Sequence, residues 1–246
     1  MTDLLRAELL KLRTTRTFVG LTGVAVATSL IIAVLVSILT EPARDSVVAD
    51  VYASDTSSFF ILLLGAIGIS GEWRHRTITS SLLAAPHRVR LLGAKTLAYA
   101  AAGVVMSLAI MASVAAAATV VLAVRGQPLP GAGELLAQVG RNAAVAALLG
   151  AFGVTVGGLI RSQIAAVVAL LALGFVAEPL VVALAPAVGR FGPLGGLANA
   201  IAGIPEDMGN EDLVLLGTGP AIAAMLAWIG TTFAAAAVLL VRRDLE

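Results

Sequence analysis

The sequence predicts an all-α integral membrane protein. Of its 246 residues, 59% are hydrophobic and only 13% are charged, whereas soluble domains are about 45–50% apolar and about 25% charged. Mean hydropathy is correspondingly high, at +0.99. Ala, Val, Leu and Gly dominate and aromatic residues make up only 4%, which favours closely packed helices over the short alternating strands of a membrane barrel.

Six segments are apolar enough to cross a bilayer core of about 30 Å, which takes roughly 20 helical residues. The predicted spans are 18–40, 55–71, 91–124, 142–160, 164–188 and 215–241. The second span is short unless it extends back through Asp55. The third is longer than a bilayer requires, so we expect one of its ends to project into water.

Residues 1–17 precede the first span and have the pattern of an amphipathic helix. Leu5, Leu9 and Leu12 form one apolar stripe, flanked by Arg6 and Arg13 on one side and by Glu8 on the other. This pattern predicts a helix lying in the membrane interface, with its cations near anionic headgroups. The alternative is a short solvated arm whose charges only set the topology.

The cations are distributed unevenly along the chain, which carries a net charge of only +1. Twelve of the sixteen Lys and Arg residues lie before span one, between spans two and three, after span four and at the C-terminus. Because Lys and Arg in short loops stay on the cytoplasmic side, we expect both termini and the segment 72–90 to face the cytoplasm.

Two patterns that resemble catalytic motifs lack their partners. Residues 68–71 read GISG, as in intramembrane serine proteases, but both histidines, His75 and His87, lie in the adjoining loop rather than on another span. Residues 93–96 read GAKT, without the adjacent Gly-Lys of a phosphate loop and without a preceding strand. The absence of cysteine excludes thiolate chemistry and cysteine-based metal sites. We therefore expect no catalytic or metal-binding residue.

Polar residues inside or beside the spans are the next candidates. An ionised Glu178 within span five costs about 2.5 to 3.5 kcal/mol at the centre of a helix, so it should face protein, a partner or water. It either lies on a translocation path or is a packing carboxylate, and Pro179 after it should kink the helix. Asp55 and Ser58 belong to a polar start of span two, which either caps that helix or lines a pathway entrance.

Glycine and proline mark two further features. Residues 191–204 are too short to cross the membrane and too apolar for a free loop, so they predict a re-entrant or surface-lying outer hairpin before span six. Gly153 and Gly157 form a GxxxG pattern in span four, which predicts close packing against another helix.

With these features, the whole chain, residues 1–246, resembles the permease subunit of type 2 ABC exporters, and the resemblance implies a single transmembrane permease domain. The resemblance rests on a cationic N-terminal helix, AELLKLRTTRT, and on six spans with both ends inside. It rests above all on residues 71–95, GEWRHRTITSSLLAAPHRVRLLGAK. That segment is similar to the family's Gly-Glu-aromatic-Arg stretch, followed by Thr-Ile, a Leu-rich helix and a basic run into span three.

In such transporters this loop forms a coupling helix that docks on a separate ATPase subunit. The resemblance implies that the coupling residues are Glu72, Arg74, Arg76, Thr77, Ile78, Leu82, Leu83, Arg88 and Arg90. A short helix that exposes Ile and Leu in the cytoplasm is stabilised by burial against a partner. The alternative is that the cations of this segment only fix the topology.

The resemblance also implies partners. They are a P-loop ATPase subunit that carries ATP and Mg²⁺, a second permease copy or paralogue, and the membrane lipid of a bacterial plasma membrane. This chain would bind no cofactor or nucleic acid and would not itself be an enzyme. Spans two and five would line the translocation path, on which Asp55, Ser58 and Glu178 fall.

Two alternatives stay open. One is a secondary transporter or channel that needs no ATPase, with Glu178 as the ion carrier, although paired interrupted spans are lacking. The other is an accessory or immunity subunit that binds a partner without transporting.

Overall fold

A computed structural model of the chain describes residues 2–53, 55–74, 88–160, 162–204 and 213–242. These residues form helices and connecting turns and contain no strand. The long helices are α1 (Thr2–Thr14), α2 (Arg16–Leu39), α3 (Ser57–Arg74), α5 (Arg88–Val124), α6 (Ala132–Leu159) and α11 (Thr218–Arg242). Between α6 and α11 lie α7 (Gln163–Ala172), α8 (Glu178–Leu184), α9 (Pro186–Gly189) and α10 (Gly196–Ala202).

Six helical segments in the described residues are long and apolar enough to cross a membrane, which confirms the predicted class of helical membrane protein. The bounds of these segments differ in two places from those of the spans predicted from the sequence. A π-helical turn, η1 (Val48–Tyr52), precedes α3, so the second segment begins well before Asp55. Helix α6 begins at Ala132 rather than near Asn142, and the backbone amide of Gly131 donates to Glu134 Oε2 at 2.9 Å at its first turn.

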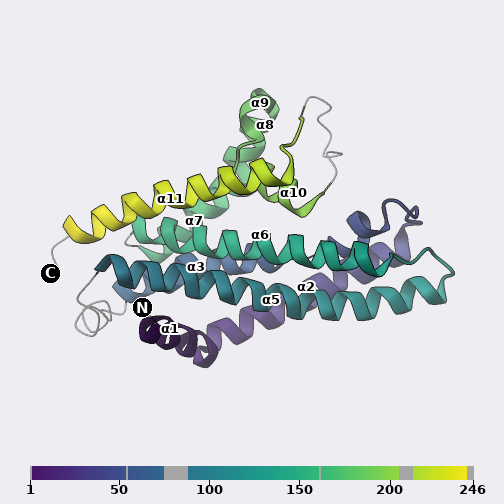
Figure 1. Ribbon diagram of the computed structural model, residues 1–246, viewed down its shortest axis with the longest axis horizontal. Helices are drawn as coiled ribbons and strands as arrows, with labels where there is room; N and C mark the ends of the chain where they lie inside the picture. Colours follow the sequence, from purple (N-terminus) through teal and green to yellow (C-terminus); the bar gives the residue numbers. More distant parts are fainter. Residues whose placement is uncertain (1, 54, 75–87, 161, 205–212, 243–246) are drawn as a thin grey trace.

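Helices α3, α5 and α6 lie side by side along the longest axis of the molecule (Figure 1). Helix α2 packs on α5, and α11 packs on α6. Helix α5 has 37 residues, which at 1.5 Å per residue gives a rod of about 56 Å. It is therefore longer than a bilayer core requires, as the sequence predicts.

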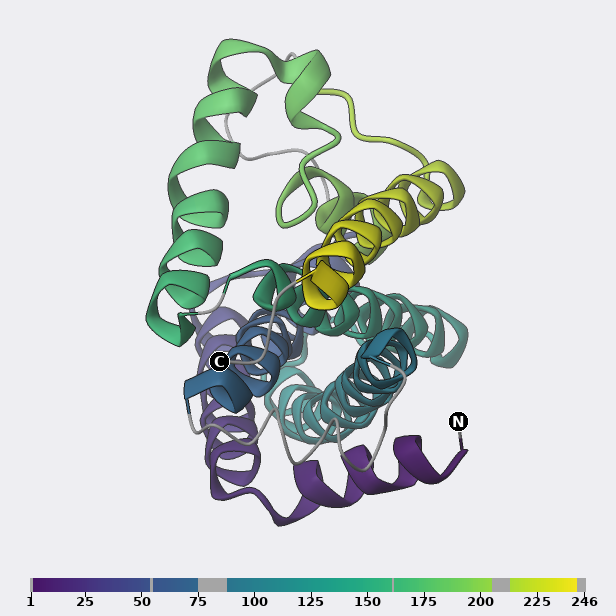
Figure 2. The ribbon, with the colours of Figure 1, turned by 90° about the vertical axis from the view of Figure 1, so that its left-hand side faces the viewer.

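Helix α1 lies across the end of the bundle at which α5 begins (Figure 2). The predicted apolar stripe is only partly buried, because Leu12 is buried and Leu5 is half-buried while Leu9 is exposed. Glu8, expected at the flank of the stripe, is instead 3% exposed. The helix is therefore rotated so that a carboxylate faces the bundle.

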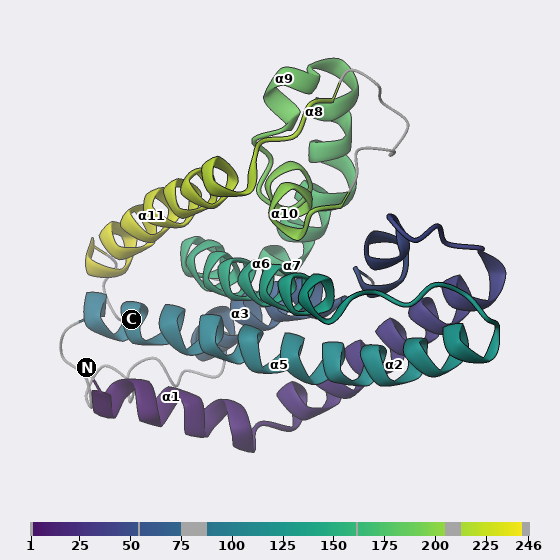
Figure 3. The same ribbon diagram turned by 45° about the vertical axis from the view of Figure 1, so that its right-hand side comes forward.

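The fifth predicted span is one helical segment, Gln163–Leu184, but it is not α-helical throughout. A π-helical turn, η2 (Leu173–Ala177), separates α7 from α8, directly before Glu178 and Pro179. Proline has no N–H and its ring crowds the carbonyl four residues earlier, so a wider turn relieves the clash. In Figure 2 the helices α3, α5 and α6 are seen nearly end-on, whereas α7 and α8 run up the left-hand side of the picture. Figure 3 shows the same steep inclination of this segment.

Helices α3 and α6 approach so closely that their backbones touch. A Cβ atom on Gly153 would overlap the carbonyl oxygen of Leu62, and one on Gly157 would lie 2.7 Å from the Cα of Ala66. Gly65 of α3 meets Gly150 of α6 in the same way, with 2.7 Å from its added Cβ to the carbonyl oxygen. The close packing predicted from the GxxxG pattern is confirmed, and α3 is the partner helix.

We expect Gly153→Ala to lower the free energy of unfolding by about 1–3 kcal/mol, because the added methyl group forces α3 away from α6. Thermal unfolding in detergent, followed by helical ellipticity, measures the change. Gly230→Ala in α11 is the matched control, since no atom lies within 4 Å of its added Cβ. Equal midpoints for the two variants would show that the α3–α6 contact is not tight.

Candidate functional site

Four charged side chains meet at the end of the bundle where α1, α3 and α5 converge. Lys95 Nζ of α5 donates to Glu8 Oε2 of α1 at 2.6 Å and to Glu72 Oε1 of α3 at 2.9 Å. Lys11 Nζ of α1 donates to Glu8 Oε1 at 2.8 Å and to Glu72 Oε1 at 3.5 Å. Two cations and two carboxylates thus form a neutral cluster that joins three helices, which we call the ionic cluster.

The ionic cluster is largely withdrawn from solvent. The side chains of Lys95 and Glu8 are each 4% exposed, and that of Glu72 is 11% exposed, whereas Lys11 is 52% exposed. Burial raises the pKa of Glu8, but the ion pairs with Lys95 and Lys11 outweigh burial and hold the pKa below its ordinary value. Buried charges of this kind are tolerated only when each has its partner.

A cavity of about 430 Å³ lies against the ionic cluster. Its lining residues are Glu8, Lys11, Leu12, Thr15, Thr17, Phe18, Leu64, Ile67, Gly68, Gly71, Glu72, Lys95, Tyr99 and Gln163. The glycine at position 68 makes room for the ring of Tyr99, since a Cβ there would overlap the phenol hydroxyl. Glu72 borders this cavity, but its Oε2 atom is covered by protein and has no hydrogen-bond partner in the described structure.

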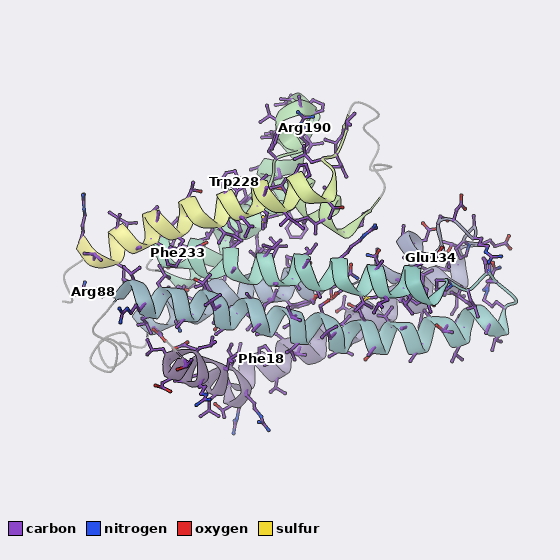
Figure 4. The ribbon with its side chains drawn as sticks, viewed as in Figure 1. Phe18, Arg88, Glu134, Arg190, Trp228 and Phe233 are labelled. Carbon is purple, nitrogen blue, oxygen red and sulfur yellow. The ribbon has the colours of Figure 1, made fainter. Side chains whose placement is uncertain are left out.

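The predicted coupling residues are only partly within the described residues. Glu72 belongs to the ionic cluster, and Arg90 is exposed on the first turn of α5. Arg88 donates to the carbonyl oxygen of Leu240 at 2.7 Å, which ties the start of α5 to the end of α11. A cation at the C-terminal end of a helix also complements its dipole. Figure 4 shows Arg88 at this end of the bundle and Glu134 at the other.

The remaining coupling residues lie outside the part of the chain whose side chains the structure describes. They are Arg74, Arg76, Thr77, Ile78, Leu82 and Leu83. The docking role of residues 75–87 therefore stays a prediction.

At the opposite end of α3, Asp55 has the contacts of a capping residue. Its Oδ1 accepts from the amide of Ser57 at 2.7 Å, and its Oδ2 accepts from the hydroxyl of Ser107. Asp55 and Ser58 also line a cavity of about 100 Å³, and Ser58 lines a second, largely apolar cavity of about 350 Å³ between α3, α6, α7 and Leu194. The capping contacts are thus present, and the same residues border the cavities.

Glu178 is bound by the backbone of the segment between α9 and α10. Its carboxylate accepts from the amide of Leu194 at 2.9 Å and from that of Gly195 at 2.5 Å. The side chain packs so tightly that a Cβ on Gly192 would lie 2.6 Å from Oε2. Glu178 is 6% exposed and is absent from the linings of the three cavities described above. The sequence left two roles open for Glu178, a translocation path and a packing carboxylate. These contacts fit the packing role.

Sequence reasoning missed the ionic cluster, because Glu8 was assigned to a helix flank and Lys95 to a basic run. One signal was present: Lys95 stands among Leu91, Leu92 and Ala98 in an apolar helix, where a cation requires a carboxylate partner. The pattern does not say which carboxylate that is.

Comparison of the chain with protein-family models and with curated proteins finds no match. Within the described residues, no three His, Asp or Glu side chains gather in a group that could hold a metal ion. The fold and the candidate site therefore define a class, an α-helical membrane protein with a buried ionic cluster at the end of the bundle that holds the N-terminal helix.

We expect Lys95→Met to lower the free energy of unfolding by about 3–5 kcal/mol, because it leaves two buried carboxylates without their shared cation. Lys11→Met is the matched control, since Lys11 is half-exposed and its removal leaves Lys95 in contact with both carboxylates, so we expect a smaller loss. Thermal unfolding of both variants in detergent provides the measurement. A similar loss in the two variants would mean that Lys95 does not hold the cluster together.

We expect Glu178→Ala to increase amide hydrogen exchange at Leu194 and Gly195 by about tenfold or more, because a buried donor left unpaired costs about 1–3 kcal/mol. Exchange measured by mass spectrometry on peptides that cover 189–204 reports this change. Glu134→Ala, which removes an exposed cap at Gly131, should leave that region unchanged. Unaltered exchange in Glu178→Ala would argue that the carboxylate does not order the segment.

Proposed function

We propose that the chain is the permease subunit of an ABC exporter, which forms the translocation path and couples to a separate P-loop ATPase subunit. The observation that carries the proposal is the ionic cluster. It binds the end of α3 to the start of α5, the two ends between which residues 75–87 run, and it binds both to α1. The proposed coupling segment therefore starts and ends on one rigid platform.

A rigid platform is what such coupling requires. When an ATPase moves residues 75–87, the contacts of Glu72 with Lys95 oblige α3 and α5 to move together. Arg88 carries the displacement to the end of α11, and the touching backbones of α3 and α6 carry it along the bundle. In this proposal α1 lies in the cytoplasmic interface of the plasma membrane and both termini are cytoplasmic.

The cavity of about 350 Å³ is the proposed part of the translocation path that this chain contributes. It is bordered by Ser58 and Leu62 of α3, by Phe175 of the π-helical turn and by Leu194. An apolar lining of this kind favours amphipathic or hydrophobic cargo. Phe175 of η2 and Leu180 and Leu184 of α8 are exposed next to this cavity, and in this proposal a second permease copy or paralogue covers them and completes the path.

We further propose that α9 and α10 form a hairpin that enters the outer leaflet and returns. Helix α10 is apolar and buried, with Leu197 and Ile201 packed in the cluster that also holds Met225 of α11. Trp228 Nε1 of α11 donates to the carbonyl oxygen of Phe191 at 3.0 Å, which fastens the hairpin to that helix (Figure 4 labels Trp228 and Arg190).

The alternative of an ion-driven secondary transporter finds less support. Its candidate carrier, Glu178, has its carboxylate held by two backbone amides, and a carrier must release such contacts at every cycle. The alternative of an accessory subunit differs from the main proposal in one property. An accessory subunit would bind the partner but would not support ATP-dependent efflux.

We expect the chain to purify from its native membrane with a P-loop ATPase and to stimulate that enzyme's turnover. Ile78→Asp should abolish both, because it places a charge in the proposed docking surface. Leu129→Asp is the matched control, an exposed apolar residue after α5, at the opposite end of the bundle. Assembly and stimulation are measured by co-purification and by phosphate release in liposomes.

Three results would count against the proposal. Intact assembly and stimulation in Ile78→Asp would remove the coupling assignment. Efflux driven by an ion gradient with this chain alone would indicate a secondary transporter. Assembly with an ATPase but no ATP-dependent efflux of any amphipathic cargo would indicate an accessory subunit.

A further inference from the structure

Two of the cavities described above share a wall. The smaller, of about 100 Å³, is bordered by several polar side chains, among them Asp55 and Asn142. The larger, of about 350 Å³, is bordered mainly by leucine and phenylalanine. Because Ser58, Leu194 and Asn199 line both cavities, the two spaces adjoin at these residues. A polar space and an apolar space therefore meet at a junction that contains two polar side chains.

The two polar side chains at this junction have no hydrogen-bond partner among the described residues. Neither the hydroxyl of Ser58 nor the side-chain amide of Asn199 is bonded there, and both residues are partly exposed. The buried polar atoms that lack a partner in the described structure lie on other residues, namely Thr22, Ser57, Glu72 and Arg190. The polar atoms of Ser58 and Asn199 are therefore accessible to a molecule in the cavities that these residues line.

Asn199 is the exception in its helix. Every other residue of α10 (Gly196–Ala202) is buried and has no polar side chain, whereas Asn199 is polar and only partly buried. An amide in apolar surroundings costs free energy unless it has a hydrogen-bond partner. The amide of Asn199 offers donors and an acceptor, and so does the hydroxyl of Ser58. The junction therefore fits a polar group that both donates and accepts hydrogen bonds.

The charge of the lining argues for a neutral group. Asp55 is the only charged side chain among the described residues that line either cavity. The ion pairs of the described structure all belong to the ionic cluster, so none of them offsets the charge of Asp55. A second carboxylate nearby would be unfavourable. An ammonium has donors only and would leave the N–H groups of Asn199 unpaired.

We propose that the joined cavities bind a neutral amphiphile whose head is a hydroxyl or an amide. The head lies at the junction and exchanges hydrogen bonds with Ser58 and Asn199, and the apolar body occupies the larger cavity. Phe175, which borders that cavity, is 69% exposed, so the body enters from the lipid side. The inference rests on the proposed function in treating this ligand as cargo, whereas binding itself requires only the two cavities.

The test measures equilibrium binding of tritiated dodecanamide to the full chain in nanodiscs, with empty nanodiscs as the blank. The competitors carry a chain of the same length and a different head: methyl dodecanoate has no donor, dodecylamine is a cation without an acceptor, and dodecanoate is an anion. Each competitor is quantified in the nanodisc lipid, so that partitioning does not distort the comparison. We expect unlabelled dodecanamide to compete about tenfold better than each of the three, because each leaves a polar group at the junction unpaired or adds a negative charge.

Substitutions at the junction test the two contacts. Ser58→Ala and Asn199→Ala should each weaken the binding of dodecanamide about threefold to tenfold, as the loss of one hydrogen bond implies. Both changes remove groups that are unbonded within the described residues, so the fold does not depend on them. Ser46→Ala is the matched control, since Ser46 lies at the same end of the bundle but outside both cavity linings, and it should bind dodecanamide like the unaltered chain.

Three results would overturn the inference. Dodecanamide could bind no better than to empty nanodiscs, in which case water fills the cavities. The methyl ester could compete as well as the amide, or binding could be unchanged in both Ser58→Ala and Asn199→Ala. Loss of ATP-dependent efflux with binding intact would instead count against the proposed function alone, and absent binding with ATPase stimulation intact would count against this inference alone.

Discussion

A single buried lysine determines how one end of this protein is built. Lys95 stands in α5 among apolar neighbours and is 3% exposed, so the free energy of its charge must be recovered from partners in contact with it. Glu8 and Glu72 supply them from two other helices. The orientation of α1 follows from this requirement, because Glu8 can reach Lys95 only if the polar edge of α1 turns toward the bundle and Leu9 turns outward.

The second constraint is the absence of side chains where α3 meets α6. With glycine at positions 65, 150, 153 and 157, the two backbones come into direct contact, which is how helices associate when lipid offers no hydrophobic advantage. Such a seam cannot slide without a clash of backbone atoms. Together with the ionic cluster it joins α1, α3, α5 and α6 into one unit. Helices α7 and α8, which a π-helical turn connects, are mostly exposed and lie outside this unit.

The sequence predicts the helical class, the six apolar segments and the glycine contact, because run length and glycine spacing are local properties. It fails where tertiary contacts decide. The apolar run of span four begins at Asn142, whereas helix α6 begins ten residues earlier, at Ala132, and includes the polar residues Gln138 and Asn142. In the structure Gln138 Nε2 donates to Asn142 Oδ1 at 2.8 Å and to the carbonyl oxygen of Ala202 at 3.0 Å, so the helix continues through these two residues.

The ionic cluster is another contact that the sequence does not predict. Glu8 and Lys95 are 87 residues apart, and no spacing rule links them. The partners of Glu178 are backbone amides, which a residue pattern does not display.

Glu72 and Glu178 show how a buried carboxylate can be assigned a role from its contacts. Both are acidic residues beside or within apolar segments; the resemblance implies a coupling role for Glu72, whereas two roles stay open for Glu178 from the sequence. Both oxygens of Glu178 accept hydrogen bonds from the chain's own amides, so the carboxylate has its hydrogen-bond partners within the chain and holds the segment before α10. Glu72 uses one oxygen to hold Lys95, whereas its other oxygen is buried without a hydrogen-bond partner. Because the carboxylate of Glu72 joins α3 to α5 through Lys95, its contacts determine how these two helices are held together at this end of the bundle.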